Sequence, residues 1–342
     1  MNVSRRALIS GLGTGSLSLG LAIAPSSRTR ASDFYQGRTL TLIVGFAPGG
    51  GVDSNARLIS RHLARFIAGQ PNIVVQNMEG AGGVVAANHV NQRAVADGLT
   101  IAVPGRSWYV EGIVKSPGVT FDPTRFTWIG SPGAVNSMLY VRAATGVRNF
   151  DDLKASPQTL TFGSLGASTP TGMIPAMLAA TGLPIKIIYG YGSTTRVLLA
   201  LEQGEIDGVF TVDDSFARRQ DLLTNRIVVP ILQNKPAIAG LPLLRDALPK
   251  ERASLLTLAL ALENFGLPVV GPPGIPADRV EILRGAFLAM CADREFQLEA
   301  TKFDLPTGAP LDGARLKVMI DELAAVATPD VIAAYKWFGG AR

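Results

Sequence analysis

Apolar and polar positions along the first part of the chain switch between two periods. TLTLIVGF (39–46), NIVVQN (72–77) and LTIAV (99–103) are short apolar runs of strand type. Residues 55–68, and the stretch that GAGGVVAANHVNQ (80–92) opens, carry apolar residues at helical spacing. Strands that alternate with helices in this way predict a parallel sheet covered by helices.

A second series of the same kind follows a stretch, 104–137, that is rich in glycine, proline, serine and aromatic residues. SMLYVR (137–142) reads as a strand that crosses between the two series. The elements expected after it are strands at 159–164, 185–191, 205–210 and 227–233, helices at 171–181, 194–204, 279–302 and 313–326, and a buried helix or strand at 255–262. We therefore expect an α/β fold with two similar lobes.

Composition supports a folded chain that does not bind nucleic acid. The 342 residues are 47% hydrophobic and 17% charged, which suits two globular domains. The isoelectric point of about 9.5 suggests a polyanionic partner. Four of the 32 basic residues lie in residues 1–31, which hold no acid, so 28 basic and 27 acidic residues remain in the rest. Without a basic stripe there, we expect no nucleic-acid partner.

The first 31 residues have the pattern of an export signal. Ser4-Arg5-Arg6 precedes a weakly apolar, glycine-rich stretch (7–24), and Thr29-Arg30-Ala31 offers a cleavage site. Paired arginines favour a twin-arginine signal, and an ordinary secretory signal is the alternative. Either signal predicts a protein that leaves the cytoplasm for the periplasm.

Side chains that commonly carry chemistry are few. Cys291 is the one cysteine, so neither an intramolecular disulfide nor a cysteine metal site is expected, and we interpret it as a small buried hydrophobe. His62 and His89 both lie in helical patterns. We expect no catalytic residue, no metal and no cofactor.

Four glycine-containing turns stand where a strand leads into a helix. They are the first turn APGGGVDSN (47–55), the second turn EGAGGVV (79–85), the third turn GSLGASTPTG (163–172) and the fourth turn GYGSTTR (190–196). A helix start offers unpaired N–H groups and the positive end of the helix dipole, and glycine lets an anion approach closely. Since ligands of parallel sheets sit at the carboxyl ends of strands, these turns predict a carboxylate or phosphate site.

Three other chemistries fit poorly. A nucleotide-binding Walker loop needs lysine where Gly51 stands, and a dinucleotide fingerprint needs glycine where Ser54 stands. A nucleophile elbow around Ser164 needs glycine where Phe162 stands. A serine nucleophile also needs a histidine base, and neither histidine lies in a strand-end loop.

Taken together, these motifs make the chain resemble the periplasmic solute receptors of tripartite tricarboxylate transporters, the Bug family. The resemblance runs from about Gly37 to about Leu323. The matching pieces are TLIVGFAPGGGVDSNAR (41–57), VVQNMEGAGGVVAANHV (74–90), ADGLTIAV (96–103), FGSLGASTP (162–170), IIYGYGSTTRVLLALEQGEIDGVF (187–210) and GPPGIPADRVEIL (271–283). The first two pieces together are quite specific, whereas GEIDG alone is not.

The resemblance implies a type II-like, two-lobed periplasmic binding protein that closes on its ligand. It implies a first lobe from 33–136 plus 268–342, a second lobe from 137–267, and a hinge at crossing strands near 137–142 and 266–271. Implied ligand-binding residues are Phe46, Ala47, Gly50, Gly51, Val52, Asp53, Gly82 and Gly83 in the first lobe, and Ser164, Ser168, Thr169 and Asp213 in the second.

The sequence also departs from the family pattern at three places. Relatives commonly carry proline where this chain has Gly45, a basic residue near Met78-Glu79, and a His-Leu pair in place of Met173-Ile174. The ligand therefore cannot be copied from relatives.

Arg106 follows a strand, and Arg196 lies in the first turn of a helix, where a cation is slightly unfavourable. Each arginine either pairs a second ligand carboxylate or is a solvated surface side chain. Asp53 either caps its own helix or shapes the loop before it. Asp213 either accepts a ligand hydroxyl or ammonium or lies in a solvated loop, and Trp108 and Tyr109 either stack on an aromatic ligand or pack in the core.

The function expected from these features is capture of a small carboxylate by a monomeric receptor, which delivers it to integral-membrane permease subunits. A ligand sensor that feeds a signalling partner is the alternative, and a hydrolytic enzyme is a weaker one.

Overall fold

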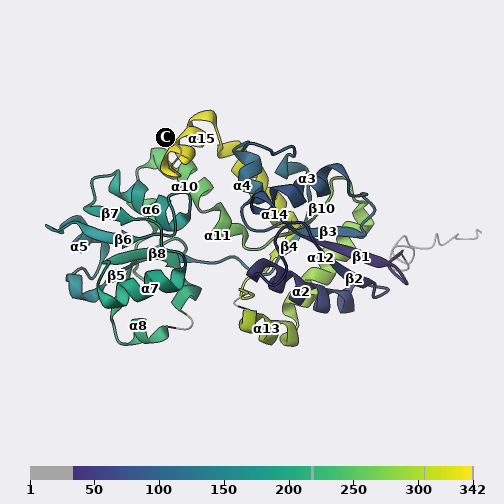
Figure 1. Ribbon diagram of the computed structural model, residues 1–342, viewed down its shortest axis with the longest axis horizontal. Coiled ribbons are helices and arrows are strands. Elements are labelled where there is room, and N and C mark those ends of the chain that lie inside the picture. The colour runs from purple at the N-terminus through teal and green to yellow at the C-terminus, as the bar shows by residue number, and fades with distance from the viewer. Residues whose placement is uncertain (1–33, 217–218, 304, 341–342) are drawn as a thin grey trace, which may run out of the picture.

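The computed structural model describes residues 34–216, 219–303 and 305–340, which form two lobes side by side, each built around its own sheet (Figure 1). The predicted α/β fold with two lobes and mixed sheets is confirmed. The export signal predicted for 1–31 lies outside the described residues. Across the described part of the chain, no helix combines the length and the apolar character that a membrane crossing needs.

The sheet of the first lobe has six strands in the order β11-β4-β10-β3-β1-β2. They are β1 (Thr39–Val44), β2 (Asn72–Asn77), β3 (Thr100–Val103), β4 (Thr127–Ser131), β10 (Val269–Gly271) and β11 (Leu311–Asp312). β1 runs parallel to β2 and β3, whereas β10 is antiparallel to β3 and β4. The carboxyl ends of β1, β2 and β3 therefore meet at one edge of the sheet.

Helices cover both faces of this sheet, which explains why β1 is apolar along most of its length. Leu40 and Leu42 pack into the core under one face, and Ile43 packs under the other. The helices are α2 (Gly51–Leu63), α12 (Ala277–Ala292) and α13 (Arg294–Ala300) on the first face, and α3 (Val84–Gln92), α4 (Trp108–Ile113) and α14 (Gly313–Val326) on the second. The helix predicted for 279–302 is divided at Asp293, whose carboxylate caps α13.

The sheet of the second lobe has the order β7-β6-β8-β5-β9. Its strands are β5 (Ser137–Arg142), β6 (Leu160–Gly163), β7 (Ile185–Ile188), β8 (Gly208–Val212) and β9 (Val228–Gln233). Its helices are α6 (Pro170–Ala179), α7 (Thr194–Gln203), α8 (Gln220–Thr224), α10 (Ala253–Ala259) and the short α5 (Phe150–Lys154) and α9 (Leu244–Ala247). β6 is parallel to β7 and β8, so the third and fourth turns again leave one edge together.

The chain crosses between the lobes beside the predicted hinge strands, not within them. β5 and β10 each lie inside one sheet. The crossings are the segment 132–136 and the passage from α10 into α11 (Ala261–Phe265), because Leu260 is buried in the core of the second lobe and Phe265 in that of the first. They run together, because the Val135 N–H donates to the Glu263 carbonyl (3.0 Å) and the Leu267 N–H donates to Ser131 Oγ (3.1 Å).

A third crossing leads to α15 (Pro329–Phe338), a helix that the sequence analysis does not predict. Figure 1 shows α15 beside α10, and Phe338 is buried in the core of the second lobe. Val331 and Ile332 pack against the core of the first lobe. The helix thus joins both lobes, and the lobe boundaries given above stay a prediction.

Candidate functional site

The ends of β1, β2 and β3 bring the first turn, the second turn and the segment after β3 into close contact. A Cβ atom on Gly45 would lie 2.2 Å from the carbonyl oxygen of Pro104, and one on Gly83 would lie 1.9 Å from the same atom. The Phe46 ring lies against Gly105, where a Cβ would be 2.4 Å away. Tight backbone packing therefore requires glycine at 45, 83 and 105.

Asp53 holds the first turn in place. Its carboxylate, which is almost fully buried, accepts hydrogen bonds from the Gly49 N–H (2.8 Å), Asn77 Nδ2 (2.7 Å) and Arg57 Nε (2.8 Å). Asn77 also donates to the Phe46 carbonyl (2.8 Å). Burial raises the pKa of Asp53, but the bonds from Arg57, Asn77 and Gly49 outweigh it and leave the pKa below its usual value.

Asp53 does not cap its own helix, which was one of the two roles considered for it. The residue that precedes the first turn of α2 is Gly50, and among the described residues no side chain accepts a hydrogen bond from the helix start. The N–H groups of Gly51, Val52 and Asp53 therefore have no intrahelical acceptor. In Figure 1, α2 begins on the side of the first lobe that is turned toward the second lobe.

The start of α2 is also sterically open. Residues 47–51 are exposed, and a Cβ on Gly51 would meet no atom within 4 Å. Gly49 is different, because its φ of +82° lies in the left-handed region that favours glycine. Gly49 shapes the turn, and Gly51 leaves room in front of the helix end.

The second turn has an unusual backbone. Gly80, Ala81, Gly82 and Gly83 all have positive φ, at 142°, 47°, 64° and 97°. Ala81 is strained in this conformation, which non-glycine residues adopt mainly where neighbouring structure imposes it. Gly82 is exposed, and no side chain caps the start of α3.

In the second lobe, three hydroxyl groups build the third turn. Thr169 Oγ1 donates to the Gly166 carbonyl (2.7 Å), and the Thr171 hydroxyl lies 2.7 Å from Thr169 Oγ1 and 3.0 Å from Ser164 Oγ. Ser164 is buried, and its hydroxyl group is used inside the turn. Ser168 is exposed, and Thr169 precedes α6 without a capping bond from its side chain. The sequence analysis missed Thr171, although it stands directly after Thr169-Pro170.

The fourth turn places Arg196 on the surface. Ser193 caps α7 by accepting a hydrogen bond from the Arg196 N–H (3.3 Å), and the Arg196 side chain lines a shallow hollow with Tyr191 and Gln203. Asp213 opens the 3₁₀ helix that follows β8, and its side chain lies outside what the structure describes.

Trp108 and Tyr109 belong to the core, so the option that they stack on a ligand is wrong. Both are fully buried; the Trp108 ring stacks on Trp128 (5.6 Å between centroids), and the Tyr109 hydroxyl donates to the Ala261 carbonyl (3.1 Å). Burial raises the pKa of Tyr109, and the charge of the nearby Arg106 partly opposes this. Arg106 is half-buried after β3 and lies close to this aromatic cluster.

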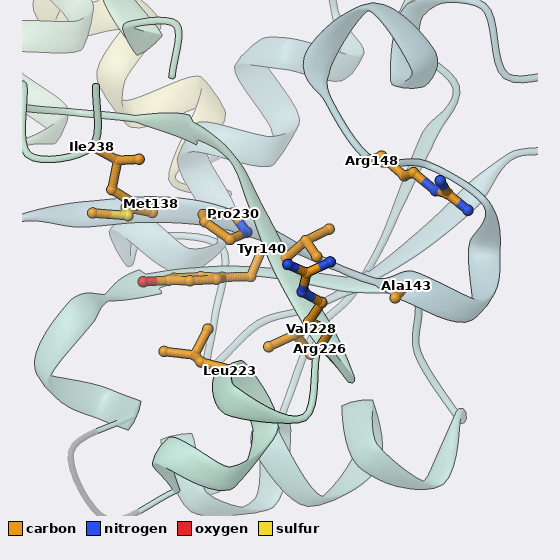
Figure 2. A pocket seen from close by; sticks show the side chains of 10 residues that line it. Met138, Tyr140, Ala143, Arg148, Leu223, Arg226, Val228, Pro230 and Ile238 are labelled. Atoms are coloured by element: carbon orange, nitrogen blue, oxygen red, sulfur yellow. The ribbon is translucent and has the colours of Figure 1, made fainter. Parts of the chain in front are cut away.

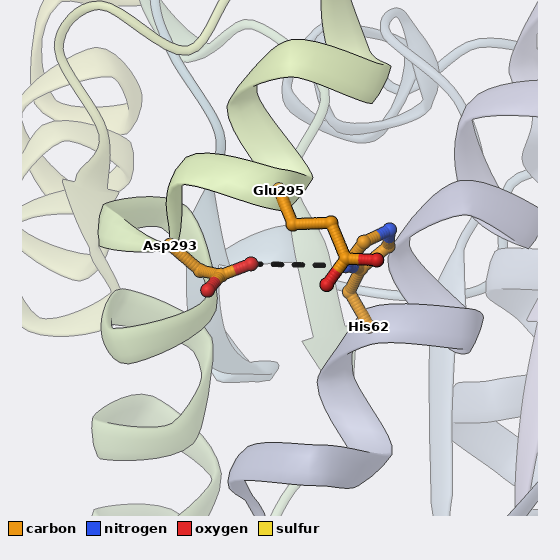
Figure 3. Close-up of side chains that lie close together, drawn as sticks. All are labelled: His62, Asp293 and Glu295. Atoms are coloured by element: carbon orange, nitrogen blue, oxygen red, sulfur yellow. Dashed lines mark ion pairs between the residues drawn. The ribbon is translucent and has the colours of Figure 1, made fainter.

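One group of side chains has the composition of a metal site but not its chemistry. His62, Asp293 and Glu295 come close together between α2 and α13 (Figure 3). The guanidinium group of Arg65 lies among them, 2.6 Å from Glu295, 3.5 Å from Asp293 and 3.4 Å from the His62 ring. His62 Nε2 is also paired with Glu299 at 2.8 Å. The positive charge of Arg65 already lies where a metal ion would bind. We interpret the group as an ion-pair network that joins α2 and α13.

The histidines and the cysteine lie where the sequence analysis expects them. His62 lies in α2 and His89 in α3, so neither is in a turn at the carboxyl end of a strand. Cys291 is buried in α12, and burial raises the pKa of its thiol to about 12. A reactive thiolate at neutral pH is therefore not expected from it.

Comparison of the sequence with known proteins finds one matching family model and a related sequence. The model of the tripartite tricarboxylate transporter receptor family, TctC, matches residues 56–220. A UPF0065 protein of Pseudomonas sp. (strain P51) is 28% identical over 291 residues, which cover 82% of this chain and 80% of the relative.

Solved structures share the fold. A TctC solute-binding protein from Polaromonas, without ligand, has a TM-score of 0.68 at 17% identity, covering 86% of this chain and 97% of its own. Two Rhodopseudomonas palustris proteins are also similar, MatC with bound malate (TM-score 0.52, 21% identity, 86% and 99% coverage) and one with adipate (0.53, 20%, 87% and 97%). By the matched segment, the sequence relative and the shared fold, this chain is similar to the tripartite tricarboxylate transporter receptor family, the family that its sequence motifs indicate.

Proposed function

We propose that this protein is a periplasmic receptor that binds a small organic acid between its two lobes, with one carboxylate at the start of α2. The observation that carries the proposal is the open helix start at Gly51, which has free N–H groups and no capping side chain. The structural relatives with malate and adipate support a carboxylate ligand.

In this proposal the first lobe positions the anion and the second lobe completes the site. Ala47, Gly50, Gly51, Val52 and Gly82 face the ligand, whereas Gly83 and Asp53 keep the loops in shape. From the third turn, exposed Ser168 supplies a polar contact, with half-buried Thr169 beside it. The hydroxyl groups of Ser164 and Thr169 both make hydrogen bonds within that turn.

Arg106 and Arg196 are the proposed partners of a second carboxylate, one from each lobe, and Asp213 is a proposed contact of a ligand hydroxyl. A dicarboxylate would then bridge the lobes and favour the closed state, because it binds that state better than the open one. Arg196 is exposed in the fourth turn, where it has room to move toward a ligand.

We further propose that the loaded receptor delivers its ligand to integral-membrane permease subunits and catalyses no reaction. The family is one of solute receptors of a transporter, which favours delivery over the alternative of a sensor that feeds a signalling partner. Export by a signal within residues 1–31 and action as a monomer are parts of the same proposal.

Thermal denaturation of residues 32–342 with single organic acids tests the proposal. Malate, adipate, citrate, benzoate and glutamate form the panel, and a ligand at one hundred times its Kd adds about 2.7 kcal/mol to the free energy of unfolding. We expect at least one di- or tricarboxylate to raise the melting temperature by a few degrees. A flat response to all five, in protein that native mass spectrometry shows to be ligand-free, would refute a receptor for these acids.

A further inference from the structure

The second lobe contains a large cavity that none of the four turns touches. Its volume is about 810 Å³, within the range of sites for small organic molecules. It lies at the edge of the sheet, where β5 and β9 are only partly covered by α8. All its lining residues come from one lobe, so the cavity is present whether the lobes are open or closed.

The lining is apolar with a positive rim. Met138, Tyr140, Leu223 and Ile238 contribute apolar surface, and Arg148 and Arg226 are the charged members. None of the described lining residues carries a carboxylate. In Figure 2 the apolar side chains gather around Tyr140, with Arg226 beside them and Arg148 farther along the rim. Such a lining suits a molecule with an apolar body and one negative charge.

The backbone at Arg226 adds an independent argument. Arg226 has a φ of +53° at the end of α8, directly after the residue that closes the helix. Glycine is the usual residue at this place, because a side chain in the left-handed region costs about 1–2 kcal/mol. An arginine is therefore held in a strained conformation at the rim of an apolar cavity, which is a reason to look for a function.

We propose that this cavity is a second binding site, for an organic monoanion with an aromatic or medium-chain apolar body. The body would lie against Met138, Leu223 and Ile238, and the anionic group would pair with Arg226. The site is separate from the proposed carboxylate site at α2, and either can fail without the other.

Fluorescence titration of residues 32–342 with 8-anilinonaphthalene-1-sulfonate, an aromatic monoanion, tests the proposal. We expect one probe molecule per protein, displaced by 4-phenylbutyrate but not by the neutral 4-phenylbutanol. Arg226→Gly removes the charge and relieves the backbone, so it should weaken probe binding roughly tenfold or more without lowering the melting temperature. Ile238→Glu, at an exposed loop position, should also weaken binding.

Matched variants separate this site from other binding. Arg245→Ala removes an exposed arginine of the same lobe outside the cavity and should leave the titration unchanged, as should Gly51→Val at the start of α2. Unchanged probe affinity in both Arg226→Gly and Ile238→Glu would overturn the proposal. So would equal displacement by the acid and the alcohol, or loss of probe binding in Gly51→Val.

Discussion

At the scale of single residues, the glycines of the candidate site have different structural roles. Gly49 satisfies a left-handed backbone, Gly83 allows contact with Pro104, and Gly51 leaves space in front of a helix. In the sequence all three are glycines of two similar turns, Gly49 and Gly51 in the first and Gly83 in the second. Only the structure separates them, because the distinction depends on φ and on atoms that are far away along the chain.

Asp53 gives a prediction that depends on pH. Its folded-state pKa is lowered, so its carboxylate stabilises the fold above the unfolded pKa of about 3.9, and this stabilisation is lost as pH falls through the lower folded pKa. Asp53→Asn should cost about 1–3 kcal/mol at pH 7, because a buried acceptor is weakened while Arg57 loses its ion pair.

Urea denaturation of Asp53→Asn and wild type at pH 7, 5 and 3 measures this effect. The difference in unfolding free energy should hold at pH 7 and 5 and shrink at pH 3. A difference that stays constant down to pH 3 would mean that the charge of Asp53 does not stabilise the first turn.

At the scale of elements, strands and long helices followed the apolar pattern well. The predicted strands 72–77 and 137–142 and the helix 313–326 coincide with β2, β5 and α14. β4 was missed within its aromatic surroundings, and α15 was missed although Thr328 and Pro329 give it a standard start. The residues that hold the turns, such as Asn77 and Thr171, could not be found, because their roles depend on contacts across the fold.

The second turn offers a paired test at this scale. Gly82 and Gly83 both have positive φ, but an added Cβ would lie 3.4 Å from Ser107 Oγ at Gly82 and 1.9 Å from the Pro104 carbonyl at Gly83. Gly83→Ala should therefore cost roughly 2–4 kcal/mol of unfolding free energy, and Gly82→Ala about 1 kcal/mol. Chemical denaturation measures both, and equal costs would contradict the packing role given to Gly83.

At the scale of the whole molecule, the crossing segments also approach each other closely beside their two hydrogen bonds. Gly266 has φ +64° and ψ −125°, a conformation open essentially to glycine, and a Cβ there would lie 1.9 Å from the Gly133 carbonyl. The resemblance places the hinge in this region but assigns it to strands. β5 and β10 each lie inside one sheet, so we expect movement between the lobes in the segments beside these strands.

Gly266→Ala tests this arrangement. We expect it to lose roughly 2–4 kcal/mol of unfolding free energy or to force the two segments apart, which small-angle scattering would detect as a changed radius of gyration. Gly146→Ala is the matched control, since Gly146 also has positive φ (+83°) but would have no atom within 4 Å of its Cβ. It should cost only about 1 kcal/mol and leave the scattering unchanged. If Gly266→Ala and Gly146→Ala had the same unfolding free energy and the same radius of gyration, close packing of the crossing segments would be contradicted.

The central claim is that a carboxylate binds at the start of α2, and isothermal titration calorimetry of Gly51→Val tests it most directly. The titrant is the acid that most stabilises the wild type in the panel above. Gly285→Val, at an exposed glycine of α12 with open space around it, controls for adding the same side chain elsewhere. The account predicts that Gly51→Val folds normally and loses detectable binding, because valine fills the place of the anion, while Gly285→Val binds like the wild type. Unchanged affinity in Gly51→Val would contradict it.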